Sequence, residues 1–160
     1  MVPRLRLVER LNAGTQRSLT LVSAPAGFGK TTILSEWAAQ SPMPVAWLSL
    51  DPGDNDPVRF LSYLVAAINE VANGAGTEAL ALLGSSPPYP PQMIIASLLS
   101  GLEIMPHPLV LVLDDYHVLN ERSLHEALAF LLDHLPPQVR LVLATRADPP
   151  IPLARLRARG

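Results

Sequence analysis

Residues 18–40, SLTLVSAPAGFGKTTILSEWAAQ, decide the fold. The stretch opens with a short apolar run, Ser18 to Ser23, which predicts a buried strand, and the Pro/Gly cluster after it predicts a loop. Thr31 to Gln40 has the pattern of a helix, which Ser41 and Pro42 end. A strand, a glycine-containing loop and a helix in this order are the context that a phosphate-binding loop requires.

The loop itself carries the residues that phosphate binding needs. Gly27 and Gly29 leave backbone amides free to approach phosphate oxygens. Lys30 is the one lysine among twelve basic residues, and it is expected to reach the β- and γ-phosphates, while the hydroxyl of Thr31 coordinates Mg²⁺. The alternative is an ordinary helix start with an exposed lysine. The expected nucleotide contacts are Ala24, which stands where the strict pattern has Gly, Gly27, Phe28, Gly29, Lys30, Thr31 and Thr32.

Strands and helices alternate along the rest of the chain, which predicts an α/β fold with a mostly parallel sheet. The unbroken apolar run LVLVL at 109–113 is typical of a parallel strand covered on both faces. Residues 73–91 interrupt the alternation and are expected to form a surface excursion. The predicted strands are 18–23, 45–50, 109–113 and 140–145, and the predicted helices are 31–40, 57–71, 92–102, 123–135 and 152–159.

Two polar pairs follow predicted strands. Asp114 and Asp115 come directly after LVLVL, where ligands bind in open α/β folds. Asp114 suits a carboxylate linked to Mg²⁺, and Asp115 suits a general base or water-positioning group. Thr145 and Arg146 follow the last strand, so Arg146 is expected to contact a γ-phosphate oxygen and Thr145 a water or phosphate oxygen. The alternatives are turn formation by the aspartates and a surface role for the arginine.

Composition excludes several classes of protein. The 160 residues are 49% hydrophobic, enough for one domain over residues 1–160. Only 16% of residues are charged and the formal net charge is −2, which argues against DNA binding by this segment. The absence of cysteine excludes disulfides and thiolate chemistry and is compatible with the cytoplasm. The N-terminus is a poor signal peptide, and no apolar run approaches the roughly 20 residues of a membrane span.

Other polar and aromatic residues favour structural roles. Asp51, Asp54 and Asp56 lack the spacing of a calcium loop, so they are expected to cap helices and form turns, with a nucleotide-side role for Asp51 as the minor alternative. Trp37 and Trp47 are expected in the core. The four histidines, His107, His117, His125 and His134, lack zinc-helix spacing. Arg155, Arg157 and Arg159 are expected on a solvated helix face, with a phosphate lid or a DNA-facing strip as alternatives.

Taken together, the chain resembles the ATPase domain of the large MalT/LuxR-type transcriptional regulators, members of the STAND class of P-loop ATPases. The matching stretches are LVSAPAGFGKTTILSEWAAQ, VAWLSLDPGDNDPVRFLSYLVAAI, LVLVLDDYHVL and HEALAFLLDHLPPQVRLVLATRADPPIPLARLRARG. The resemblance implies a P-loop three-layer sandwich of about four core strands, binding of ATP or ADP with Mg²⁺, and slow hydrolysis used as a switch. It places metal coordination on Thr31 and Asp114, water activation on Asp115, phosphate sensing on Arg146 and adenine near Pro3 and Arg4 in the N-terminal segment 1–17.

The resemblance also sets expectations for the parent protein. Such regulators continue into a fifth core strand, a winged-helix domain, a sensor domain and a helix-turn-helix, none of which is expected within residues 1–160. DNA binding is therefore expected only through a domain absent from this chain. The missing strand would flank the phosphate-loop strand, which predicts an exposed edge and self-association. A small-molecule kinase and a nonfunctional ATPase remnant are the alternative functions.

Overall fold

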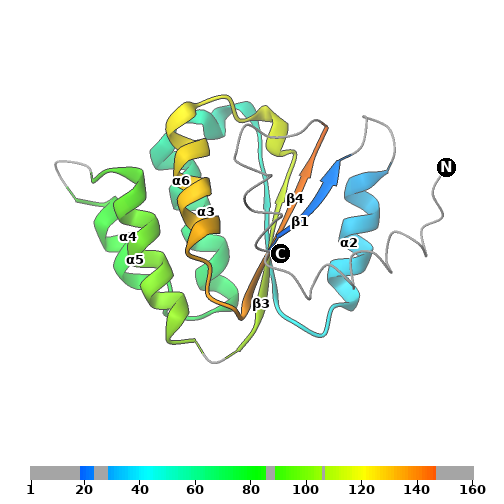
Figure 1. The fold of residues 1–160 in the computed structure, drawn as a ribbon, viewed down its shortest axis with the longest axis horizontal. Helices are drawn as coiled ribbons and strands as arrows, with labels where there is room; N and C mark the ends of the chain where they lie inside the picture. The colour runs from blue at the N-terminus through cyan, green and yellow to red at the C-terminus, as the bar shows by residue number, and fades with distance from the viewer. Residues whose placement is uncertain (1–18, 24–28, 86–88, 106, 147–160) are drawn as a thin grey trace.

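A computed structural model describes residues 19–23, 29–85, 89–105 and 107–146. These residues form three layers: helix α2 lies on one face of a four-stranded parallel sheet, and helices α3 to α6 lie on the other (Figure 1). The predicted sandwich is thereby confirmed. In chain order the elements are β1 (Leu19–Ser23), α2 (Lys30–Gln40), β2 (Val45–Ser49), the 3₁₀ turn η1 (Pro52–Asn55), α3 (Pro57–Val71), α4 (Thr77–Leu83), α5 (Pro91–Glu103), β3 (Leu109–Asp114), the 3₁₀ turn η2 (Tyr116–Val118), α6 (Arg122–Asp133) and β4 (Val139–Thr145).

The sheet has the strand order β1-β4-β3-β2, with every neighbouring pair parallel. All six residues of β3 are buried, as its apolar sequence predicts for a strand covered on both faces. Alternate side chains of β3 face opposite layers: Val110 and Val112 pack with α2, whereas Leu111 and Leu113 pack with the α3–α6 layer. The sheet therefore divides the core into two parts.

Helix α3 has the bounds that its sequence predicts. Asp56 caps its N-terminus by accepting a hydrogen bond from the amide of Val58 (3.2 Å), and Pro57 fits the first helical position because no amide is needed there. The apolar side chains recur at helical spacing, so one face is buried against the sheet. The buried residues are Phe60, Leu61, Leu64, Val65 and Ile68.

The expected surface excursion at 73–91 needs a correction in its described part. Residues 77–83 form the helix α4, and Ala75 and Ala79 are buried in the main core. Small side chains allow this segment to approach α5 closely, which hydropathy alone does not reveal. The Ser85–Pro91 stretch is described only in part, and the predicted helix at 152–159 lies outside the described residues.

Strand β1, which leads into the phosphate loop, is an edge strand among the four described strands, as predicted. Its Leu19 and Leu21 are only half-buried, unlike the fully buried β3. Self-association through this edge remains a prediction. Within the described residues, no helix combines the length and the apolar character that crossing a membrane requires.

The close approach of α5 to residue 75 predicts the effect of a glycine substitution. A Cβ at Gly101 would lie against the carbonyl oxygen of Ala75, well inside van der Waals contact. Although alanine favours a helix by about 1 kcal/mol, this overpacking costs about 1–3 kcal/mol, so Gly101→Ala should lower the free energy of unfolding in urea. Gly84→Ala is the control, because its Cβ would lie 3.7 Å from the backbone oxygen of Ala81, in ordinary van der Waals contact, at a right-handed φ. Equal stability of the two variants would contradict the prediction.

Candidate nucleotide site

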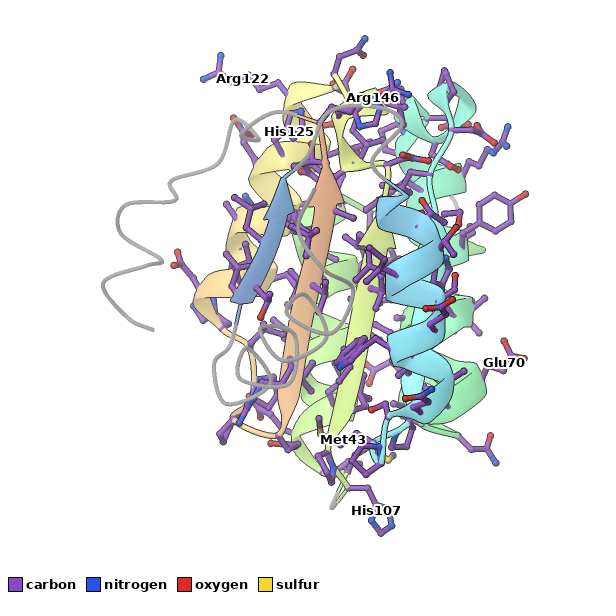
Figure 2. The ribbon with its side chains drawn as sticks, turned by 90° about the vertical axis from the view of Figure 1, so that its right-hand side faces the viewer. Met43, Glu70, His107, Arg122, His125 and Arg146 are labelled. Carbon is purple, nitrogen blue, oxygen red and sulfur yellow. The ribbon has the colours of Figure 1, made fainter. Side chains whose placement is uncertain are left out.

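The carboxyl ends of the strands bring the predicted site residues to one edge of the sheet. Ser23, which leads into the phosphate loop, pairs in register with Thr145, and Ser49 pairs with Asp114. In Figure 2, Arg146 and His125 lie at this end of the molecule, whereas Met43 and His107 lie at the opposite end. Residues far apart in the sequence therefore meet here, as expected for a ligand-binding edge.

A hydrogen bond at this edge joins Thr31 to Asp114. The hydroxyl Oγ1 of Thr31 donates a hydrogen bond to Oδ2 of Asp114 (2.8 Å), although the two residues are 83 positions apart. Asp114 is 1% exposed, and its other oxygen, Oδ1, accepts from the amide of Asp115 (3.0 Å). The carboxylate is thus held on both oxygens, and the predicted metal-coordinating pair is brought together.

The start of α2 has the backbone geometry of a loop that turns sharply into a helix. Gly29 has φ 69° and ψ 23°, in the left-handed region that glycine adopts without strain. Its carbonyl accepts the first helical hydrogen bond from Ile33 (3.0 Å), and Lys30 is the first residue of α2. The predicted contacts of Ala24, Gly27 and Phe28 lie outside the described residues, as do those of Pro3 and Arg4 and the arginines at 155, 157 and 159. Thr32 is described and exposed.

Asp115 adopts an uncommon backbone conformation. Its φ is 60° and its ψ is 41°, and among the described residues it is the one non-glycine residue with positive φ. Aspartate tolerates this left-handed region better than most residues, but the conformation still requires support from its surroundings. Such backbone geometry concentrates at functional sites, and here it turns the chain immediately after the buried Asp114.

Arg146 and Thr145 end the strand that lies between β1 and β3. Thr145 is fully buried, whereas the Arg146 side chain is exposed at the carboxyl edge (Figure 2). Because β4 separates the phosphate-loop strand from the acidic strand, Arg146 is placed between the two predicted parts of the site.

The aspartates after β2 form turns, as the sequence predicts. Asp51 accepts from the amide of Gly53 (2.8 Å), and Asp54 accepts from the amide of Asp51 (2.9 Å), so the two carboxylates form a reciprocal capping box. Arg59 pairs with both carboxylates, at 3.2 Å from Asp51 and 3.3 Å from Asp54. Within the described part of the chain, no group of three or more His, Cys, Asp or Glu side chains is arranged to hold a metal ion.

Comparison with known proteins places this geometry in a family. A family model described as an AAA ATPase domain matches residues 5–143. The chain belongs to the AAA ATPase domain family. Among solved structures, Cdc6p of Pyrobaculum aerophilum superposes with a TM-score of 0.60 over 98% of this chain and 43% of that one, at 16% sequence identity. At this low sequence identity, the likeness concerns the fold only.

Curated relatives confirm the resemblance to MalT-type regulators. This AAA ATPase domain is 41% identical over 160 residues to the HTH-type transcriptional regulator MalT of Cronobacter sakazakii. It is 40% identical over 158 residues to the MalT of Serratia proteamaculans and 35% identical over 158 residues to that of Vibrio cholerae. Each match covers 99% of this chain, which spans 17% of the relative's length.

A buried tyrosine and histidine support the turn that follows Asp115, and the sequence analysis did not identify this pair. Tyr116 Oη lies 2.7 Å from Nδ1 of His125, and both side chains are buried. Burial raises the pKa of Tyr116, so its hydroxyl stays protonated and shares a hydrogen bond with the imidazole nitrogen. Burial also lowers the pKa of His125, although a hydrogen bond to Leu119 and the charge of Glu121 oppose this effect. His125 is thus a buried histidine of the core.

The lowered pKa of His125 predicts a dependence of stability on pH. Its ordinary pKa is 6.5, so as the pH falls through this value the unfolded chain binds a proton before the folded protein does. The contribution of neutral His125 to stability is complete above pH 6.5 and is lost as the pH falls toward the lower, folded pKa. Urea unfolding at pH 7.5, 6.5 and 5.5 should show a steeper loss for the wild type than for His125→Asn, which retains an acceptor but does not titrate. Parallel curves would refute this assignment.

Proposed function

We propose that this AAA ATPase domain binds ATP with Mg²⁺ and hydrolyses it slowly, as the switch of a MalT-type transcriptional regulator. The observation that carries the proposal is the hydrogen bond between Thr31 and Asp114, at the junction of the phosphate-loop helix and the acidic strand. A hydroxyl at a helix start and a carboxylate at the end of a parallel strand are the protein groups that hold Mg²⁺ in P-loop nucleotide sites. The match to the AAA ATPase family supports the same ligand.

The residues present fit a magnesium ion bound together with nucleotide. Mg²⁺ prefers oxygen ligands and is usually held by one or two protein groups, with waters and phosphate oxygens completing its shell. Thr31 would supply a hydroxyl oxygen and Asp114 a buried carboxylate, already oriented by two hydrogen bonds. When bound, the ion would neutralise charge on the β- and γ-phosphates.

The other site residues have separate proposed tasks. Lys30 and the amides at the start of α2 hold the phosphates, since a helix N-terminus favours an anion. Asp115 orients the attacking water and accepts its proton. Arg146, between the two halves of the site, contacts the γ-phosphate and distinguishes ATP from ADP. Thr145 is proposed to hold the attacking water or a phosphate oxygen.

Water, rather than a small-molecule hydroxyl, is the proposed phosphoryl acceptor. A kinase usually closes a mobile lid over its acceptor, and the sequence offers the stretch 73–91 and the arginines at 155, 157 and 159 as candidates for such a lid. In its described part, this stretch contains α4, with Ala79 buried in the core. A stretch that is packed into the core is a poor candidate for a mobile lid. The adjacent aspartates and the threonine–arginine pair instead suit water as the phosphoryl acceptor.

The proposal extends to the longer parent protein. The relatives are named HTH-type transcriptional regulators, and this chain spans 17% of their length. We propose that the parent protein is cytoplasmic, self-associates in response to nucleotide, and binds DNA through a separate helix-turn-helix domain. We propose that this segment itself binds nucleotide and not DNA, since its net charge of −2 gives it no overall excess of basic residues.

Calorimetric titration of Mg·ATP and Mg·ADP into the chain tests the nucleotide site. We expect saturable binding by the wild type and binding at least about tenfold weaker by Lys30→Ala, because a charge-assisted contact contributes about 1.5–3 kcal/mol. Circular dichroism of both proteins is the control for folding. Absence of binding by the folded wild type would reject the proposal for this chain and leave any function to the longer parent protein.

Replacement of Asp115 tests the hydrolytic step separately from binding. In Asp115→Asn we expect kcat for phosphate release to fall by about 10²-fold or more, as for loss of a general base, with the Kd for Mg·ATP changed by less than about threefold. Asp133→Asn, at the last residue of α6, is the matched control and should leave kcat unchanged. Phosphate release that continues at the wild-type rate in Asp115→Asn would remove Asp115 from the mechanism. ADP formation that requires an added alcohol acceptor would instead indicate a kinase.

A further inference from the structure

We propose that Asn55 is a positioning residue for ATP hydrolysis, because it fixes the chain segment that follows Asp115. This inference rests on the proposed function of the site. Asn55 ends η1, in the connection between β2 and α3, and its side chain reaches the connection between β3 and α6. It therefore joins two connections that are more than 60 positions apart in sequence.

The side-chain amide of Asn55 makes four hydrogen bonds to backbone groups. Its Nδ2 donates to the carbonyl oxygens of Pro52 and Val118, each at 3.0 Å. Its Oδ1 accepts from the amides of Asn120 (2.7 Å) and Glu121 (3.1 Å). Both donor hydrogens and both lone pairs of the amide are therefore used.

Three of these bonds hold the segment that continues directly from Asp115. The amide of Val118 donates to the carbonyl oxygen of Asp115 (3.1 Å), and the carbonyl of Val118 accepts from Asn55. Asn55 is thus two hydrogen bonds away from the backbone of the proposed water-activating residue. Because Asp115 has a left-handed conformation, its geometry depends on a fixed downstream chain. Asn55 supplies that support from outside the β3–α6 connection.

The connection that carries Asn55 is itself held firmly. The capping box of Asp51 and Asp54 closes η1, and Arg59 pairs with both carboxylates. Asp54 is buried, so its ion pair is less screened than one on the surface. In addition, the amide of Leu50 donates to the carbonyl oxygen of Asp114 (3.0 Å). Asn55 therefore connects the β3–α6 segment to a rigid support.

Asparagine is the residue type that this position requires. An aspartate would keep the two acceptor bonds to Asn120 and Glu121 but would place a carboxylate against the carbonyl oxygens of Pro52 and Val118. An alanine would remove all four bonds. The two substitutions therefore weaken the support to different extents.

Asn69 provides a matched control within the same protein. Its Oδ1 accepts from the amides of Gly74 and Gly76, each at 3.0 Å, so it also orders a connection between elements. It lies near the C-terminal end of α3, whereas Asn55 lies beside the N-terminal end of that helix. Asn69→Ala should lower stability without changing the site.

Steady-state hydrolysis of Mg·ATP by Asn55→Ala, Asn55→Asp and Asn69→Ala tests the proposal. We expect kcat to fall at least about tenfold in Asn55→Ala, since misplacement of a catalytic group by about 1 Å can cost about 10²-fold, whereas the Kd for Mg·ATP changes less than about threefold. Asn55→Asp, which keeps two of the bonds, should lie between Asn55→Ala and the wild type, and it provides the test if the alanine variant does not fold. Asn69→Ala should keep the wild-type kcat.

Amide hydrogen exchange without nucleotide gives a second readout. The amides of Asp115 and Val118 do not bond to Asn55, so their faster exchange in Asn55→Ala, but not in Asn69→Ala, would report loss of support for the segment. A wild-type kcat in Asn55→Ala, or a parallel loss of kcat and Mg·ATP affinity, would overturn the positioning role alone. Absence of hydrolysis by the wild type would overturn the proposed function and this role with it.

Discussion

The hydrogen bond from Thr31 to Asp114 connects the phosphate-loop helix α2 to the end of strand β3. The register of the parallel strands makes this bond possible. Thr31 lies on the helix that follows the edge strand β1, and Asp114 ends β3, two strands away. The parallel pairing of β4 with both neighbours aligns the carboxyl ends of all three strands. A register slip of one residue would turn Asp114 from one face of the sheet to the other and break the contact.

Sequence patterns were sufficient for the elements that this register depends on. The apolar run at 109–113 has no polar residue to mark an exposed face, so it predicts a strand covered by helices on both sides, and β3 is such a strand. Asp56 and Pro57 together mark the start of α3, because Asp56 supplies the cap and Pro57 has no backbone amide that would need a partner. Signals of this kind depend only on residues close in sequence, which is why the sequence alone was enough to predict these elements.

Other features depend on contacts that no local pattern records. The helix α4 is short, and its core contribution comes from alanines that fit against α5 and Gly101, so hydropathy gave only a weak signal. Asn55 is of a residue type common in turns, and its sequence neighbourhood gives no sign of its hydrogen bonds to backbone groups more than 60 positions away. The left-handed conformation of Asp115 likewise follows from the segment after it, because an aspartate after a strand is common and carries no such information. A backbone group can make such a hydrogen bond whatever its side chain is. Long-range hydrogen bonds to the backbone therefore leave no residue pattern from which they could be predicted.

The strand order places the proposed phosphate-binding and hydrolytic groups after different strands at one edge of the sheet. The groups proposed to hold phosphates follow the edge strand β1, whereas Asp115 follows the inner strand β3 and is supported by Asn55 from the connection after the other edge strand, β2. β4 lies between them and ends in a buried threonine and an exposed arginine. In the proposed slow switch, the groups that hold the nucleotide and the group that activates water therefore follow different strands, and the hydrogen bond from Thr31 to Asp114 couples them.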